Sequence, residues 1–231
     1  LQELETLLAA VPADAPAKAY RAAIVEENVL GKGSLSTRKE TACRLTALHG
    51  FDPTQPLFRV LRRLWDVDPA AQPQLALLSG LARDPLLMAT RDQVMGMKAG
   101  QLVQRSDMVE AVQGFTHDRL SAKGLDAVAR NTPSSWTQSG HFKGKVNKQR
   151  QQLSPKPTAM ALAMWMGYAT GKRGKALLGT PWAAVLDRSS AELLELAQQA
   201  KRLGLLKFSH GGGVLSIDPS ELDPERGGEL Q

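Results

Sequence analysis

Apolar residues recur three or four positions apart along most of this chain, and short segments rich in Gly, Pro, Ser and Asp separate these stretches. Such spacing is typical of helices with one buried face. The first 120 residues show no convincing alternation of apolar and polar positions, so we expect this part to be all-helical. The predicted helices cover residues 18–30, 37 through 48, 56–65, 74–81, 85–97 and 106–120.

The second half combines helices with one hairpin. The expected helices cover residues 125–130, 135–142, 158–168 and 190–203. Ser189 and Glu192 can form a capping box at the start of the last helix. The segments 205–209 and 214–217 flank the glycines at 211–213, which predicts a β-hairpin with a glycine turn. We therefore predict a mainly α chain, with a helical part over residues 1–120 and a basic, winged-helix-like part over residues 121–231.

Amino-acid composition indicates how the core is built and in which compartment the protein is expected. Aromatic residues make up only 5% of the chain, so Leu, Ala, Val and Met must build most of the core. The single cysteine, Cys43, excludes an intramolecular disulfide and is expected to be buried with Leu45 and Leu48. A reducing cytoplasm is the expected location, and no secretory leader opens the given sequence. The apolar run at residues 159–169 is shorter than the roughly 20 residues of a membrane span, so we expect no membrane insertion.

Positive charge is concentrated within the second half. The net charge is +6, yet residues 127–186 contain no acidic residue and nine cations: Arg130, Lys143, Lys145, Lys148, Arg150, Lys156, Lys172, Arg173 and Lys175. The rest of the chain is therefore net acidic, most clearly at Asp218, Glu221, Asp223, Glu225 and Glu229, which are opposed by Arg226 alone. Such asymmetry attracts polyanions. A solvated basic face is the alternative interpretation.

Two neighbouring patterns favour nucleic acid. Residues 125–142 have the layout of a helix-turn-helix in which Trp136 would be the inward anchor. Its second helix would present Ser135, Gln138 and His141 to a DNA groove. Cations available for phosphates follow this segment or lie on the predicted helix at 37 through 48: Lys143, Lys145, Lys148, Arg150, Lys172, Arg173, Arg38, Lys39 and Arg44.

The predicted helix and hairpin at residues 190–217 form the second pattern. They resemble the last helix and the wing of a winged-helix domain, in which Lys207 and His210 would approach a phosphate. Helix-turn-helix and helix-hairpin units also occur in folds that bind nothing, and Trp136 is then simply a core residue.

Motifs for catalysis, cofactors and metals are incomplete. Residues 167–173 suggest a phosphate loop, but the glycine spacing is one residue short and no Ser or Thr follows the lysine. Residues 210–213 suggest an esterase oxyanion loop, but the chain has no nucleophile elbow. One cysteine and four histidines leave no Cys-rich zinc site. We therefore expect no enzyme activity, no cofactor and no metal.

The segments Glu27-Asn28-Val29-Leu30, Ser36-Thr37-Arg38 and Arg44-Leu45 resemble the BrxA family, whose members are encoded with BREX bacteriophage-defence systems. The resemblance covers mainly residues 20–120. It implies an all-helical body similar to that of the RNA-binding factor NusB, a DNA-binding role and no catalytic activity.

These observations together predict a non-enzymatic accessory protein of a phage-defence complex that binds double-stranded DNA with little sequence preference. One alternative is an RNA-binding, NusB-like protein. RNA readers usually stack bases on aromatic side chains, and the few aromatics of this chain fall mostly at predicted core positions, which favours DNA. The second alternative is a scaffold that binds only other proteins of the defence system.

Overall fold

The computed structural model describes residues 1–117, 119–211 and 214–224, which form a mainly helical protein with two short antiparallel ribbons. The predicted fold class, helices followed by one β-hairpin near the C-terminus, is confirmed. The helices of the first half are α1 (Gln2–Ala10), α2 (Ala17–Val25), α3 (Leu35–His49), α4 (Pro56–Trp65), α5 (Gln72–Arg83), α6 (Pro85–Ala89), α7 (Arg91–Gly96) and α8 (Arg105–Thr116). A 3-10 turn, Pro69–Ala71, precedes α5.

The second half contains the remaining helices and both ribbons. Its helices are α9 (Ala122–Gln138), α10 (Pro157–Ala169), α11 (Pro181–Ala184) and α12 (Ser190–Arg202). Two 3-10 helices, η2 (Gly174–Gly179) and η3 (Ser220–Leu222), follow α10 and the hairpin. The first ribbon pairs β1 (Phe142–Lys143) with β2 (Gln149–Arg150), and the hairpin pairs β3 (Lys207–Gly211) with β4 (Val214–Asp218).

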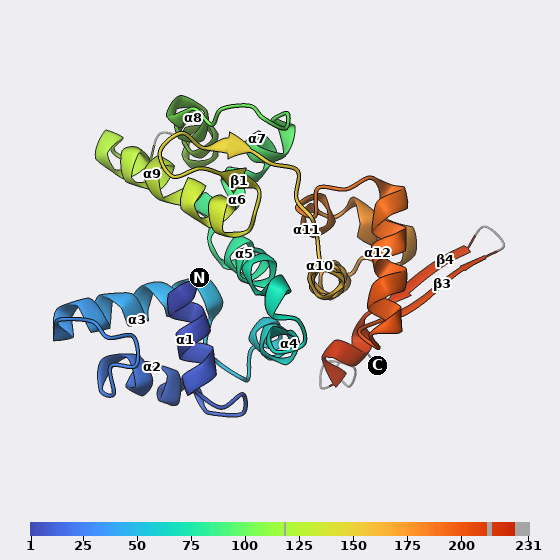
Figure 1. Ribbon diagram of the computed structural model, residues 1–231, viewed down its shortest axis with the longest axis horizontal. Coiled ribbons are helices and arrows are strands. Elements are labelled where there is room, and N and C mark those ends of the chain that lie inside the picture. Colours follow the sequence, from blue (N-terminus) through green and yellow to red (C-terminus); the bar gives the residue numbers. More distant parts are fainter. Residues whose placement is uncertain (118, 212–213, 225–231) are drawn as a thin grey trace.

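The elements are spread along one long axis (Figure 1). Helices α1, α2 and α3 lie at one end and the β3–β4 hairpin lies at the other, with α5 and α10 between them. Helix α5 packs against α3 and α4 on one side and against α10 on the other, so it connects the two ends of the molecule. A single cluster of buried apolar side chains extends from Leu4 to Leu222.

Helix α10 is the centre of the second half. Every residue from Thr158 to Gly167 is buried, and the helix packs against α4, α5, α11 and α12. A helix that is apolar on all sides must be covered on all sides. This explains the uncharged run in the sequence as a core helix. Across the described ranges, no helix has the length and apolarity that crossing a bilayer requires.

Side-chain caps mark the starts of α12 and α3. The capping box predicted at Ser189 and Glu192 is confirmed: Ser189 Oγ accepts from Glu192 N at 3.3 Å, and Glu192 Oε2 accepts from Ser189 N at 2.9 Å. The prediction that α3 begins at Thr37 is wrong, because Ser34 is the N-cap and its side chain accepts from Thr37 N. The expectation of a buried Cys43 was also wrong. This thiol is exposed, because the buried face of α3 runs through Thr41, Ala42, Leu45 and His49.

The predicted helix-turn-helix at residues 125–142 is wrong, because α9 is one continuous helix through the proposed turn. Ala129, Thr132, Pro133 and Trp136 form its buried face, at the spacing of a helix. A proline inside a helix costs about 3 kcal/mol, since it removes one backbone hydrogen bond and crowds the preceding turn. Burial of the proline ring and of the indole beside it offsets this cost.

The boundary predicted between the two parts, at about residue 120, falls between α8 and α9. These two helices pack against each other, and α9 also contacts α5 and α6 from the first part. The division into two parts stays a prediction.

Trp136 is fully buried, and its Nε1 donates to Thr90 Oγ1 at 2.9 Å. Replacement by Ala removes this contact and leaves a large cavity, so we expect Trp136→Ala to lower the free energy of unfolding by about 3–5 kcal/mol. Trp136→Phe keeps most of the apolar contact and should cost clearly less. Urea denaturation followed by circular dichroism measures both variants. An unchanged midpoint for Trp136→Ala would contradict the anchoring role.

Candidate nucleic-acid interface

The β3–β4 hairpin has an inner and an outer face because its residues alternate. Phe208 pairs with Ile217, and both side chains are buried in the core. Ser209 pairs with Ser216, and both lie on the exposed outer face together with Lys207. The hairpin is therefore held by its inner face and offers hydroxyl and ammonium donors on its outer face.

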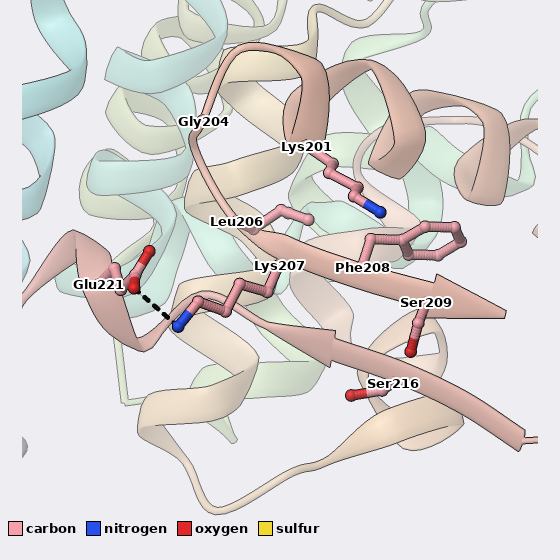
Figure 2. Close-up of a pocket in the computed structure, with 8 residues that line it drawn as sticks. All are labelled: Lys201, Gly204, Leu206, Lys207, Phe208, Ser209, Ser216 and Glu221. Atoms are coloured by element: carbon pink, nitrogen blue, oxygen red, sulfur yellow. Dashed lines mark ion pairs between the residues drawn. The ribbon is translucent and has the colours of Figure 1, made fainter.

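A groove of about 430 Å³ lies at the hairpin and includes residues from both of its faces (Figure 2). Its residues come from the end of α12, the hairpin and η3: Lys201, Gly204, Leu206, Lys207, Phe208, Ser209, Ser216 and Glu221. Lys207 Nζ lies 2.7 Å from Glu221 Oε1. The hydrogen bond that Lys207 donates to Glu221, and then the negative charge of Glu221, raise the pKa of Lys207 above its ordinary value.

The loop of residues 172–175, here named the basic loop, lies on the β4 side of the hairpin. The η2 helix that contains the end of this loop packs against β4, and a Cβ at Gly174 would lie 3.1 Å from Leu215 O. The Arg173 guanidinium sits 3.6 Å from the centre of the Tyr168 ring and donates to Tyr168 O at 2.8 Å. Lys172, Arg173 and Lys175 are all exposed, so the loop presents three cations on a fixed backbone.

Helix α12 lies on the β3 side of the hairpin, and its charges are divided along its length. Glu192 and Glu195 are exposed near its N-terminus, whereas Lys201 and Arg202 are exposed in its last turn. This distribution complements the helix dipole. Positive charge therefore flanks the hairpin on both sides, and the N-terminal half of α12 is acidic.

The β1–β2 ribbon carries a second group of cations. Lys143 and Lys145 are exposed and Lys148 is half-buried, with Val146 between them 87% exposed. The turn requires glycine at residue 144, because φ is +109° and a Cβ would lie 2.2 Å from Asn147 O. The three lysines predicted to contact phosphates are thus brought together on one turn.

The prediction that His141 and Arg150 contact DNA is wrong, because both side chains are buried. His141 is fully buried: its Nε2 lies 2.8 Å from Val185 O, and its Nδ1 lies 2.8 Å from Ser139 Oγ. Because Val185 O can only accept, the neutral ring carries its proton on Nε2. A side chain held in this way has no access to a DNA groove.

Arg150 is 2% exposed and serves as an internal connector. Its Nη2 lies 2.8 Å from Asp187 Oδ1, and its Nε donates to Val94 O at 3.0 Å. Asp187 also accepts from Leu153 N at 2.9 Å. A buried guanidinium needs such partners, and at this depth Arg150 cannot reach a phosphate.

The other predicted residues remain at the surface but are scattered. Ser135 is half-buried on α9, and Gln138 is exposed at the end of that helix. On α3, Lys39 is exposed, Arg38 donates to Val25 O at 3.3 Å, and Arg44 pairs with Glu3 at 2.6 Å. Helix α3 lies at the opposite end of the long axis from the hairpin (Figure 1), so these residues belong to a separate surface.

Sequence reasoning did not include Lys175, Lys201 and Arg202 in the site. The signal for the last two was present, because they close the predicted helix directly before the hairpin. Within the parts of the chain that the structure describes, no group of three or more His, Cys, Asp or Glu residues is placed to hold a metal ion.

Comparison with protein-family models, curated proteins and solved structures gave no match. The candidate interface therefore rests on its own geometry.

Two buried histidines make stability depend on pH. Burial lowers the pKa of His141 to about 4 and that of His49 to about 3, from the ordinary 6.5. The unfolded chain binds protons below pH 6.5 that the folded chain does not, so the free energy of unfolding falls as the pH drops from about 6.5 towards 4. Each histidine contributes up to about 1.4 kcal/mol per pH unit.

We expect His141→Gln to make this decline shallower by up to about 1.4 kcal/mol per pH unit, because one titrating ring is lost. Urea denaturation at several pH values between 7 and 5 measures the slope. His210→Gln is the matched control, since His210 is exposed on the hairpin. Parallel pH profiles of the free energy of unfolding for wild type and His141→Gln would contradict this prediction, because His141 would then bind protons alike in the folded and the unfolded chain.

Proposed function

We propose that this chain binds double-stranded DNA, with little sequence preference, through the unit formed by α10, α11, α12 and the β3–β4 hairpin. Three helices followed by a hairpin is the element order of a winged-helix domain. In this interpretation α11 and α12 take the place of the helix-turn-helix, and residues 185–189 form its turn. Helix α12 packs against both α10 and β3, which supports this assignment.

The observation that carries the proposal is the placement of cations on both sides of the hairpin. The basic loop contributes Lys172, Arg173 and Lys175 on the β4 side, and α12 contributes Lys201 and Arg202 on the β3 side. These side chains are exposed, and η2 and α12 pack against the hairpin. A duplex laid along the hairpin would meet cations spaced along its phosphate backbone, and release of its counterions would supply affinity.

The acidic start of α12 supports low sequence preference. Base edges are read by side chains that enter a groove, whereas phosphate contacts fix position without reading sequence. Glu192 and Glu195 repel the phosphates that line a groove entrance. Contacts through the hairpin and the basic loop are therefore favoured over insertion of the N-terminal half of α12.

The aromatic side chains favour duplex DNA over single-stranded RNA. Recognition of unpaired bases relies on exposed aromatic rings. Phe115 is the one exposed aromatic side chain of the described residues, and it lies on α8, away from the hairpin. Arg173 covers the ring of Tyr168. An RNA-binding role is the weaker alternative for this reason.

The resemblance of residues 20–120 to the BrxA family supports a further step of the proposal. We propose that the protein acts as a non-enzymatic accessory of a BREX-type phage-defence system and works on DNA in the cytoplasm. Other proteins of that system would be additional partners. Val146, exposed between the ribbon lysines, offers an apolar contact for such a partner.

Two variants that each remove three lysines test the proposal. Lys172→Ala/Lys175→Ala/Lys201→Ala changes the surface around the hairpin, and Lys143→Ala/Lys145→Ala/Lys148→Ala changes the β1–β2 ribbon. We expect wild-type binding to a duplex to weaken with salt with a log–log slope on the order of −4 to −5. The hairpin-side variant should be shallower by up to about 2.7 and bind all sequences more weakly. The ribbon variant should lose less.

Titrations of labelled duplex DNA, single-stranded DNA and RNA at several salt concentrations measure these slopes, with circular dichroism as the check on folding. Equal losses in the two variants would point to an unspecific effect of net charge. If neither variant altered duplex binding, the basic surface would be only solvated, and a protein-binding scaffold would be the better interpretation.

A further inference from the structure

The described end of the chain folds back over the base of the hairpin. Helix η3 directly follows β4 and places the carboxylate of Glu221 beside Lys207, at 2.7 Å. Helix α4 holds η3 in place, because Arg63 Nη1 of α4 donates to Glu221 O at 2.8 Å. The position of Glu221 is therefore set by the fold, and its contact with Lys207 does not depend on a mobile partner.

Lys207 lines the groove at the hairpin, where ammonium and hydroxyl groups could donate to a phosphate. Lys201, at the end of α12, and the hydroxyl-bearing residues Ser209 and Ser216 line the same groove (Figure 2). Lys207 instead points to Glu221, away from these hydroxyls. A carboxylate and a phosphate oxygen offer an ammonium group the same kind of charged acceptor. Glu221 is thus paired with the ammonium group that a phosphate in this groove would contact.

A second ion pair of the same segment shows the contrast between a structural contact and an exchangeable one. Asp223 accepts from Arg59 Nε and Nη2, both at 3.0 Å, and its side chain is 2% exposed. The side chains of Lys207 and Glu221 are 66% and 60% exposed. Exposed pairs of this kind are weak and are screened by salt. The Lys207–Glu221 pair can therefore open without unfolding of the segment.

We propose that Glu221 is a built-in competitor of nucleic-acid phosphate for Lys207, so that this carboxylate restrains binding at the hairpin. This inference rests on the proposed function and adds a regulation of the same site. In the free protein the carboxylate neutralises Lys207. In the complex a phosphate replaces the carboxylate, and Lys207 joins Lys201 and the basic loop in holding the backbone.

The test compares Glu221→Gln with Glu110→Gln in binding to a labelled duplex at several salt concentrations. Both variants remove one exposed carboxylate, but Glu110 lies on α8, far from the hairpin. We expect Glu221→Gln to bind about two- to fivefold more tightly than wild type, because the competing exposed pair is lost. The salt dependence should steepen by about 0.9, the contribution of one more phosphate contact. Thermal stability should be unchanged.

A double-variant cycle with Lys207→Ala separates competition from a general charge effect. With Lys207 removed, Glu221→Gln should no longer tighten binding beyond the effect of Glu110→Gln. A gain that persists without Lys207, or an equal gain for both glutamate variants, would overturn the inference and leave duplex binding intact. Absence of duplex binding by wild type and by Glu221→Gln alike would overturn the proposed function as well.

Discussion

A single guanidinium, that of Arg150, connects segments that are far apart in the sequence. It pairs with Asp187 at the turn after α11 and donates to the carbonyl of Val94 at the end of α7. The carboxylate of Asp187 in turn accepts from the backbone of Leu153, which leads into α10. Since a buried ion pair that loses one partner leaves an unpaired charge, breaking this contact would cost about 3–5 kcal/mol.

The geometry of the candidate interface depends on this connection. Arg150 is the last residue of the ribbon that carries Lys143, Lys145 and Lys148, and Asp187 lies in the turn that precedes α12. His141 strengthens the same junction through its hydrogen bond to Val185 O. The ribbon and the helix-hairpin unit are therefore fixed relative to each other. Cations at both places are therefore presented by elements that Arg150, Asp187 and His141 join.

Local signals in the sequence predicted much of the fold. The capping box at Ser189 and the alternation around Phe208 and Ile217 identify α12 and the hairpin, because both depend on neighbouring residues. The proline in α9 misled the prediction, since a local rule favoured a turn and burial of Trp136 overrode it. The roles of His141 and Arg150 depend on partners 44 and 56 residues away. No local pattern reports such partners, so a buried connector and a surface cation look alike in the sequence.

Helix α10 limits how this protein can be divided. Its ten buried residues are covered by α4 and α5 from the first half and by α11 and α12 from the second. The segment before α11 packs closely on α10 at Gly167, because a Cβ there would lie 2.9 Å from Thr180 Cγ2. A fragment cut at residue 120 would keep α10 but lose α4 and α5, and the uncovered apolar surface would favour aggregation. The helix-hairpin unit therefore needs α4 and α5 of the first half to cover the apolar surface of α10.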